Sequence, residues 1–306
     1  MKLKLEKGDR ISFFGCSVTS HGIWIREVVE HFLQKYPELE IGFYNFGISG
    51  SKGGCYNLKN RMYCDCLNVF PKYVVVMFGG NDVEMSLHGS ENPEDIKKMR
   101  ESHARYPEAL REIIQRCRAI GATPILCSPP PYDEYNDSPT EIKPGTDKDL
   151  EKLSGIAKDI AEENGLIFVD MRNAVLAHID EKPITPDRVH PNEYGYHLMA
   201  ERFLLAIGER EVEQPDKIVE ISEKNMKRYE VEQILRNIMF VERDGMGWQY
   251  EDFDRPLEER KKLLTEFNQT QDSEYWDMME RDYLKYADFK DELRGELIKR
   301  TLDMYK

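Results

Sequence analysis

The sequence predicts an α/β fold in which a parallel sheet of five strands is covered by helices on both faces. Short apolar runs alternate along the chain with longer stretches whose apolar residues recur every three or four positions. Most of the short runs lead directly into glycine, proline or small polar residues, as a strand does where it enters a turn. Strands that alternate with helices of this length favour a parallel sheet with right-handed crossovers.

The expected strands lie at about 11–14, 42–46, 73–78, 124–127 and 166–169. The run at 73–78 is continuous and rich in valine, which is typical of a central strand buried on both faces. The doubly wound, flavodoxin-like order 2-1-3-4-5 is the natural topology for this alternation, although periodicity does not by itself fix strand order.

The expected helices carry an apolar stripe that faces the core. They lie at about 23–36, 58–70, 92–120, 150–164 and 192–207. Asn92 followed by Pro93 is a typical helix start, and Gly121 is a typical stop. Asn192 is expected to cap the last of these helices.

From about residue 214 the pattern changes, because helical stripes continue while strand-like runs of comparable strength do not recur. We therefore predict an α/β domain at 1–213 and a helical C-terminal extension at 214–306. The apolar stripes of the extension need a surface to cover. We expect it to pack on the α/β domain, to mediate a homodimer or to border the pocket.

The composition is that of a polar, acidic protein, with 306 residues, a formal net charge of -14 and 33% charged residues. Nucleic acids and anionic membranes attract positive proteins, so neither is an expected partner. The charged N-terminus lacks the apolar core of a signal peptide, and no apolar run approaches the length of a membrane span. Six scattered cysteines are expected to be free thiols, and Cys64 and Cys66 lack the spacing of a zinc site. We predict a cytoplasmic location.

Four polar stretches stand where the predicted sheet has its functional edge, at 15–19, 45–50, 79–82 and 187–191. The first three follow the first three strands, and ligands of open α/β sheets bind outside the carboxyl ends of the strands. The Ser17 hydroxyl needs a base to become a nucleophile, and His190 has the right pKa range. Asp187 can orient that imidazole if the segment is an irregular loop.

Acyl transfer also needs hydrogen-bond donors for the oxyanion of the tetrahedral intermediate. The backbone N–H groups of Ser17 and Gly50 and the side-chain amide of Asn81 could supply them. Gly50 has no Cβ, so a substrate can approach its N–H closely. Asp82 is expected to orient its loop rather than to act in catalysis.

These four stretches resemble the SGNH hydrolases, the GDSL-like lipase and acylhydrolase superfamily, over about residues 8–208. The resemblance implies a three-layer α/β/α sandwich that hydrolyses esters, and sometimes thioesters or amides, usually without a metal or other cofactor. In this resemblance Ser17 matches the nucleophile and Gly50 and Asn81 match the oxyanion-hole residues. Asp187 and His190 match the closing D-x-x-H pair.

One position departs from the family pattern, because Cys16 stands where the G-D-S block has aspartate. That aspartate is not a triad acid, so chemistry at Ser17 is expected to survive. Cys16 as the nucleophile is the alternative, but a shift of one residue would turn its side chain away from the site. The remaining interpretation of Cys16 is that it is a small, buried side chain without a chemical role.

The leading hypothesis is a serine esterase that hydrolyses short acyl esters through an acyl-enzyme intermediate. The expected substrate is a small ester such as an acetylated sugar. A lysophospholipase or acyl-thioesterase is the second hypothesis. A non-catalytic carbohydrate-binding or scaffold protein on a degenerate hydrolase fold is the third. His88, shortly after the third polar stretch, is considered as a pocket residue.

Overall fold

A computed structural model describes residues 2–54, 62, 66–67, 71–179 and 184–212. The chain divides into two compact units, Met1–Ser222 and Glu223–Lys306. The account below concerns the described part of the first unit. The helices predicted after residue 214, and nearly all of the helix predicted at 58–70, lie outside the described residues. The domain boundary between 213 and 214 therefore stays a prediction.

The sheet has five parallel strands in the order β2-β1-β3-β4-β5, which confirms the predicted topology. The strands are β1 Arg10–Gly15, β2 Gly42–Gly47, β3 Tyr73–Met77, β4 Thr123–Cys127 and β5 Phe168–Val169. Gly15 at the end of β1 is in register with Gly47 of β2 and with Met77 of β3. The three polar stretches that follow these strands consequently leave the sheet side by side.

The last strand is shorter than the sequence predicts. Leu166 belongs to the expected strand, but its N–H donates to the carbonyl of Ala161 at 2.8 Å and so closes the end of the preceding helix. The register with β4 consists of Phe168 and Val169, and the carbonyl of Ile167 also accepts a hydrogen bond of 3.0 Å from the N–H of Leu126. Among the strands of the described residues, β5 has β4 as its single neighbour.

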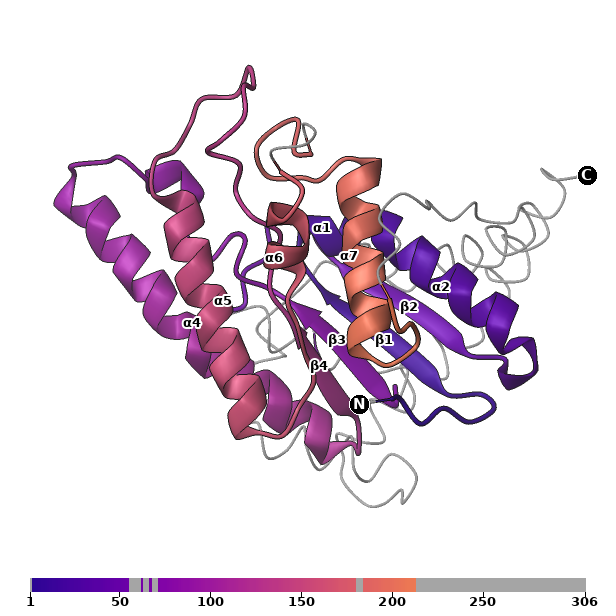
Figure 1. Ribbon diagram of the computed structural model, residues 1–306. Coiled ribbons are helices and arrows are strands. Elements are labelled where there is room, and N and C mark those ends of the chain that lie inside the picture. Colours follow the sequence, from indigo (N-terminus) through magenta and orange to yellow (C-terminus); the bar gives the residue numbers. More distant parts are fainter. Residues whose placement is uncertain (1, 55–61, 63–65, 68–70, 180–183, 213–306) are drawn as a thin grey trace, which may run out of the picture. The chain divides into compact units, whose positions relative to one another are not determined.

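The helices follow the predicted alternation with two additions. They are α1 Ser17–His21, α2 Ile23–Lys35, α4 Pro93–Ala119, α5 Thr146–Glu163, α6 Met171–Leu176 and α7 Glu193–Ala206, with short 3-10 turns η1 Pro37–Leu39 and η3 Met85–Leu87. α2 packs on α7, and α4 packs on α5, as Figure 1 shows. α1 and α6 are the additions, and α6 begins where the Asp170 carboxylate accepts a hydrogen bond from the N–H of Asn173.

The predicted helix caps are present. The Asn92 side chain accepts a hydrogen bond from the N–H of Glu94 at 3.0 Å, at the start of α4. The Asn192 side chain accepts one from the N–H of Gly195 at 3.1 Å, at the start of α7. Each cap satisfies one of the backbone donors that a helix start leaves without a partner.

Aromatic side chains hold helices to both faces of the sheet. Phe13 and Phe14 are adjacent in β1, so they point to opposite faces. The Phe13 ring meets Trp24 of α2 edge-on at 5.4 Å between centroids, and Trp24 meets Phe203 of α7 at 5.6 Å. On the other face Phe14 meets Phe78 at 5.2 Å, and the carbonyl of Phe78 accepts a hydrogen bond of 3.2 Å from the buried Tyr106 hydroxyl of α4. This arrangement is the predicted three-layer α/β/α sandwich.

A search of the described helices for a stretch long and apolar enough to cross a bilayer finds none.

Candidate active site

Ser17 is the first residue of α1 and lies directly beyond the end of β1. The turn between them requires glycine at position 15, because a Cβ there would lie 2.2 Å from Thr19 Oγ1 and 2.6 Å from the carbonyl oxygen of Met77. Gly22, in the left-handed region with φ 69, ends this short helix before α2 begins. The Ser17 hydroxyl is thus carried on a single helical turn at the carboxyl edge of the sheet.

A chain of hydrogen bonds joins this serine to the fourth polar stretch. His190 Nε2 lies 2.8 Å from Ser17 Oγ, and His190 Nδ1 lies 2.6 Å from Asp187 Oδ2. The other oxygen of Asp187 accepts hydrogen bonds from the backbone N–H groups of His190, at 2.7 Å, and Val189, at 3.0 Å. Folding therefore gathers all three side chains that the sequence pattern selects.

The Asp187 carboxylate is only half-buried, but its charged form is favoured. Burial alone would raise the pKa of Asp187, yet the hydrogen bonds from the His190 imidazole and from the N–H groups of His190 and Val189 outweigh it. The pKa of Asp187 consequently lies below its ordinary value. An ionised carboxylate at Nδ1 keeps the proton on that nitrogen and leaves Nε2 as the acceptor for the serine hydroxyl.

A second histidine lies beside His190. His21 is one turn beyond Ser17 on α1, and its ring centroid lies 4.8 Å from that of His190. A hydrogen bond of 2.9 Å joins His21 Nδ1 to the hydroxyl of Tyr196 on α7. Burial, followed by the charge of His190, lowers the pKa of His21. The ring of His190 is therefore flanked by a neutral ring that is itself held in place.

The three expected oxyanion donors come from neighbouring segments. The N–H of Ser17 is at the start of a helix, where backbone donors have no partner within the helix. Asn81 Nδ2 donates to the carbonyl of Ser51 at 3.0 Å, which leaves its second N–H for another acceptor. This bond also ties Asn81 to the residue after Gly50. Gly50 has φ 77, a conformation that disfavours other residue types.

Asp82 orients the loops, as the sequence interpretation expects. It is fully buried, and its carboxylate accepts hydrogen bonds of 3.0 Å from the N–H groups of Gly53, Gly54 and Gly79. Burial raises the pKa of Asp82, although these three bonds and the charge of Lys52 oppose the rise. One side chain therefore holds the segment that follows the second polar stretch to the third polar stretch.

Cys16 is buried, and its surroundings favour the neutral thiol. Burial raises the pKa of Cys16, and the nearby charge of Asp82 adds to the rise. A thiolate is the nucleophilic form, so this environment opposes cysteine chemistry. The geometry favours Ser17 over Cys16 as the nucleophile.

Arg188, between Asp187 and His190, is a residue whose importance the sequence reasoning missed. It is 3% exposed, and its backbone is left-handed with φ 70. Its guanidinium donates four hydrogen bonds to backbone carbonyls of one loop, those of Asp133, Asn136, Ser138 and Thr140. The only signal in the sequence is an arginine inside the D-x-x-H stretch.

A small and mainly apolar hollow opens beside the serine. Its lining comprises Cys16, Ser17, Val18, Met77, Gly80, Asn81, Met85, Pro129, Pro130, Pro131, Tyr132, Leu150 and Val189. Among the described residues considered for the site, Gly50, Asp187, His190 and His88 do not line it. His88 instead donates from Nε2 to the carbonyl of Val83 at 3.0 Å.

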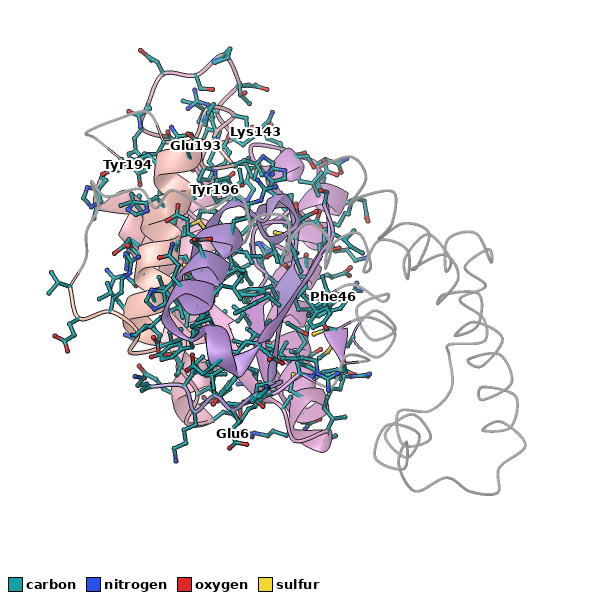
Figure 2. The ribbon with its side chains drawn as sticks, turned by 90° about the vertical axis from the view of Figure 1, so that its right-hand side faces the viewer. Glu6, Phe46, Lys143, Glu193, Tyr194 and Tyr196 are labelled. Carbon is teal, nitrogen blue, oxygen red and sulfur yellow. The ribbon has the colours of Figure 1, made fainter. Side chains whose placement is uncertain are left out.

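The loop of residues 132–145 rises over the same end of the molecule. Figure 2 shows Lys143, from this loop, at the end where Tyr196 and the start of α7 lie, whereas Glu6, which precedes β1, lies at the opposite end. The serine, the histidine and the loop that borders the hollow thus share the carboxyl edge of the sheet.

These features, together with the comparison of this chain with known proteins, identify its family. The model of the GDSL-like Lipase/Acylhydrolase family matches residues 8–198, and the chain belongs to this family. It is an SGNH-type serine hydrolase that acts on ester bonds.

Two similar proteins are acetylxylan esterases. One, from Geobacillus stearothermophilus, is 28% identical over 227 residues, which cover 67% of this chain and 97% of that protein. The other, from Xylanibacter ruminicola, is 28% identical over 220 residues, 66% of this chain but only 44% of that longer protein.

The solved structure of the Geobacillus esterase Axe2 has a TM-score of 0.56 and 26% identity, and it covers 69% of this chain and 100% of Axe2. Other structures of Axe2 are catalytic mutants in which a serine, an aspartate or a histidine is replaced by alanine, the last two being three positions apart.

Proposed function

We propose that this protein removes acetyl groups from a carbohydrate ester, with Ser17 as nucleophile, His190 as general base and Asp187 as the group that orients it. The observation that carries the proposal is the chain of two hydrogen bonds from Ser17 Oγ through His190 to Asp187, at 2.8 Å and 2.6 Å. The same three residue types are catalytic in Axe2, where the acid also precedes the histidine by three positions.

In the proposed reaction Ser17 Oγ attacks the ester carbonyl while His190 Nε2 takes the hydroxyl proton. The imidazolium that forms is stabilised by the Asp187 carboxylate at Nδ1. His190 then returns the proton to the leaving alcohol, so that the acyl group stays on Ser17. A water molecule, deprotonated by His190, hydrolyses this acyl-enzyme and regenerates the serine.

The negative charge on the carbonyl oxygen of each tetrahedral intermediate needs donors that are already in place. We assign this role to the N–H groups of Ser17 and Gly50 and to the side-chain amide of Asn81. Asn81 is held by its bond to the carbonyl of Ser51, so its free N–H need not reorganise during the reaction. Removal of one such donor costs about 100- to 1,000-fold in kcat.

Two considerations support an acetyl ester as substrate. The curated relatives are acetylxylan esterases, and the hollow beside Ser17 is small and mainly apolar, as a methyl group requires. The formal charge of -14 fits a neutral carbohydrate better than a polyanion.

The test compares Ser17→Ala with the matched variant Ser20→Ala, which removes a hydroxyl from the same short helix. Hydrolysis of p-nitrophenyl acetate and release of acetate from acetylated xylo-oligosaccharides are measured together with the far-UV circular dichroism spectrum. We expect Ser17→Ala to lose both activities and keep its fold, and Ser20→Ala to retain them. Full activity in Ser17→Ala would refute the assignment of the nucleophile. Hydrolysis of p-nitrophenyl acetate without release of acetate from the oligosaccharides would refute the carbohydrate substrate.

A further inference from the structure

The hollow beside Ser17 has walls from five separate segments. The first four are the helix start at 16–18, the third polar stretch with Met77 and Met85, the proline run 129–131 with Tyr132, and Leu150 of α5, and Val189 of the fourth polar stretch adds a fifth wall. Ser17 and Asn81 both line it. If the carbonyl oxygen of an acyl group on Ser17 points toward Asn81, the carbon chain of that group lies in this hollow.

The Tyr132 side chain is a wall that cannot easily move. It is 1% exposed, and its hydroxyl is bonded on two sides. It accepts a hydrogen bond from the N–H of Lys143 at 3.0 Å and donates one to the carbonyl of Glu141 at 3.2 Å. Rotation of the ring out of the hollow would break both of these bonds.

The backbone of this tyrosine is also fixed. Its N–H donates to Asp147 Oδ1 at 3.1 Å, and the other oxygen of Asp147 is paired with the buried guanidinium of Arg172. Three consecutive prolines, 129–131, precede it, and each has a restricted φ. The backbone at Tyr132 is therefore restricted, and so is the position of its ring at the hollow.

We propose that Tyr132 is the specificity-determining residue for the acyl group, and that its locked ring restricts the enzyme to short acyl chains. The proposal rests on the proposed function, because it takes Ser17 as the atom that carries the acyl group. It adds the physical limit on chain length. A longer chain must displace a ring whose hydroxyl makes two hydrogen bonds, on a residue whose backbone N–H makes a third and whose preceding prolines restrict the backbone.

The experiment measures kcat/KM for p-nitrophenyl acetate, butyrate and octanoate in the wild type and three variants. Tyr132→Ala removes the ring, and Tyr132→Phe keeps the ring but removes its hydroxyl. Tyr135→Ala is the matched control, because Tyr135 lies in the same loop and also bonds Asp147 but is 59% exposed and does not line the hollow.

We expect the ratio of octanoate to acetate in kcat/KM to rise at least about ten-fold in Tyr132→Ala, since one methylene accepted or rejected by an apolar pocket is worth about ten-fold or more. The ratio should stay within about two-fold of the wild type in Tyr135→Ala. Tyr132→Phe should fall between the wild type and Tyr132→Ala, because it keeps the ring but loses the two hydrogen bonds that lock it. A wild type that prefers octanoate, or an unchanged ratio in Tyr132→Ala, overturns the inference.

Labelling of Ser17 by a small ethyl fluorophosphonate separates this inference from the proposed function. A wild type that does not label at Ser17 overturns the proposed function and this inference with it. If Ser17 is labelled in both the wild type and Tyr132→Ala but the ratio of octanoate to acetate does not change, the inference about Tyr132 is wrong and the proposed function stands. If Tyr132→Ala does not fold, Tyr132→Leu is measured instead, with the same expected direction and the same refuting result.

Discussion

Arg188 allows a prediction in which stability and catalysis change together. Its guanidinium donates to four carbonyls of the 133–140 segment, with distances from 2.6 Å to 3.3 Å. Its own carbonyl accepts a bond of 2.9 Å from the N–H of Asp133. Hydrogen bonds that involve a charged group contribute about 1.5–3 kcal/mol each, and neighbouring ones overlap rather than add. We expect Arg188→Met, which keeps the apolar stem, to lower the free energy of unfolding by about 3–5 kcal/mol.

The same change should slow catalysis, because Arg188 lies between the proposed base His190 and Asp187, which orients it. A displacement of about 1 Å at a reacting group can cost about 100-fold in rate, so we expect kcat for p-nitrophenyl acetate to fall by about that factor with little change in KM. Arg188→Lys, which keeps the charge and one donor, should recover part of the loss.

Urea unfolding and steady-state kinetics on the same samples check the prediction. The control is Arg116→Met, which removes a buried guanidinium of α4 that is paired with Glu112. It should lose stability and keep kcat. Arg188→Met with wild-type stability and kcat would contradict the reasoning. An equal fall of kcat in the Arg116 control would show that loss of stability alone explains the effect.

Four further variants test separate contacts. Asp187→Asn should lower kcat about 10³- to 10⁴-fold with the fold intact, since the wrong tautomer of the imidazole is then favoured; a wild-type kcat would contradict the role of the acid. Cys16→Ala should keep the rate of p-nitrophenyl acetate hydrolysis within about two-fold, because a buried thiol of raised pKa is not expected to be the nucleophile; a loss of activity as large as that of Ser17→Ala would instead indicate Cys16 as the nucleophile. Asp82→Asn should lower the free energy of unfolding by about 2–4 kcal/mol in urea titrations, since an amide cannot accept all three N–H bonds; an unchanged midpoint would count against its anchoring role. Burial opposes ionisation of Glu209, but hydrogen bonds led by that from Lys35 outweigh it and hold its pKa below the ordinary value. The carboxylate therefore stabilises the fold above the unfolded-state pKa and loses this effect as pH falls through the folded-state pKa. The melting temperature of Glu209→Gln should lie below that of the wild type at pH 7, and the gap should close below about pH 4; a constant gap would refute the linkage.

The fold was largely predictable because each strand of the sheet is a local apolar run with a turn signal at its end. The valine-rich run that forms β3 could be placed within one residue of its observed bounds. α6 could not be predicted, since six residues carry too little periodicity and its start depends on the cap at Asp170. β5 was overestimated because the use of the Leu166 N–H in the end of a helix is not visible in a hydrophobic pattern.

The proposed site residues could be selected from the sequence because acyl transfer demands particular side chains at the ends of particular strands, and Ser17, His190 and Asp187 do lie within hydrogen-bonding distance. The supporting residues were not, since their roles depend on partners far away in the chain. Arg188 binds carbonyls about 50 residues earlier, and no local pattern distinguishes such an arginine from a surface one. The role of Tyr132 was equally hidden, because it depends on the bonds that lock its ring.

The two halves of the site are held by different parts of the fold. Ser17 depends on β1 and on the loops that Asp82 ties together, whereas His190 depends on the Arg188 contacts and on the start of α7. Only contacts between the halves can fix the distance from hydroxyl to imidazole. Besides the Ser17–His190 bond itself, the bond between His21 and Tyr196 makes such a link, from one turn after the serine to the first two turns of α7. That link does not involve the serine hydroxyl, so it persists when the hydroxyl is acylated and its bond to the imidazole is lost. In the proposed mechanism this link keeps His190 in position to activate the water that hydrolyses the acyl-enzyme.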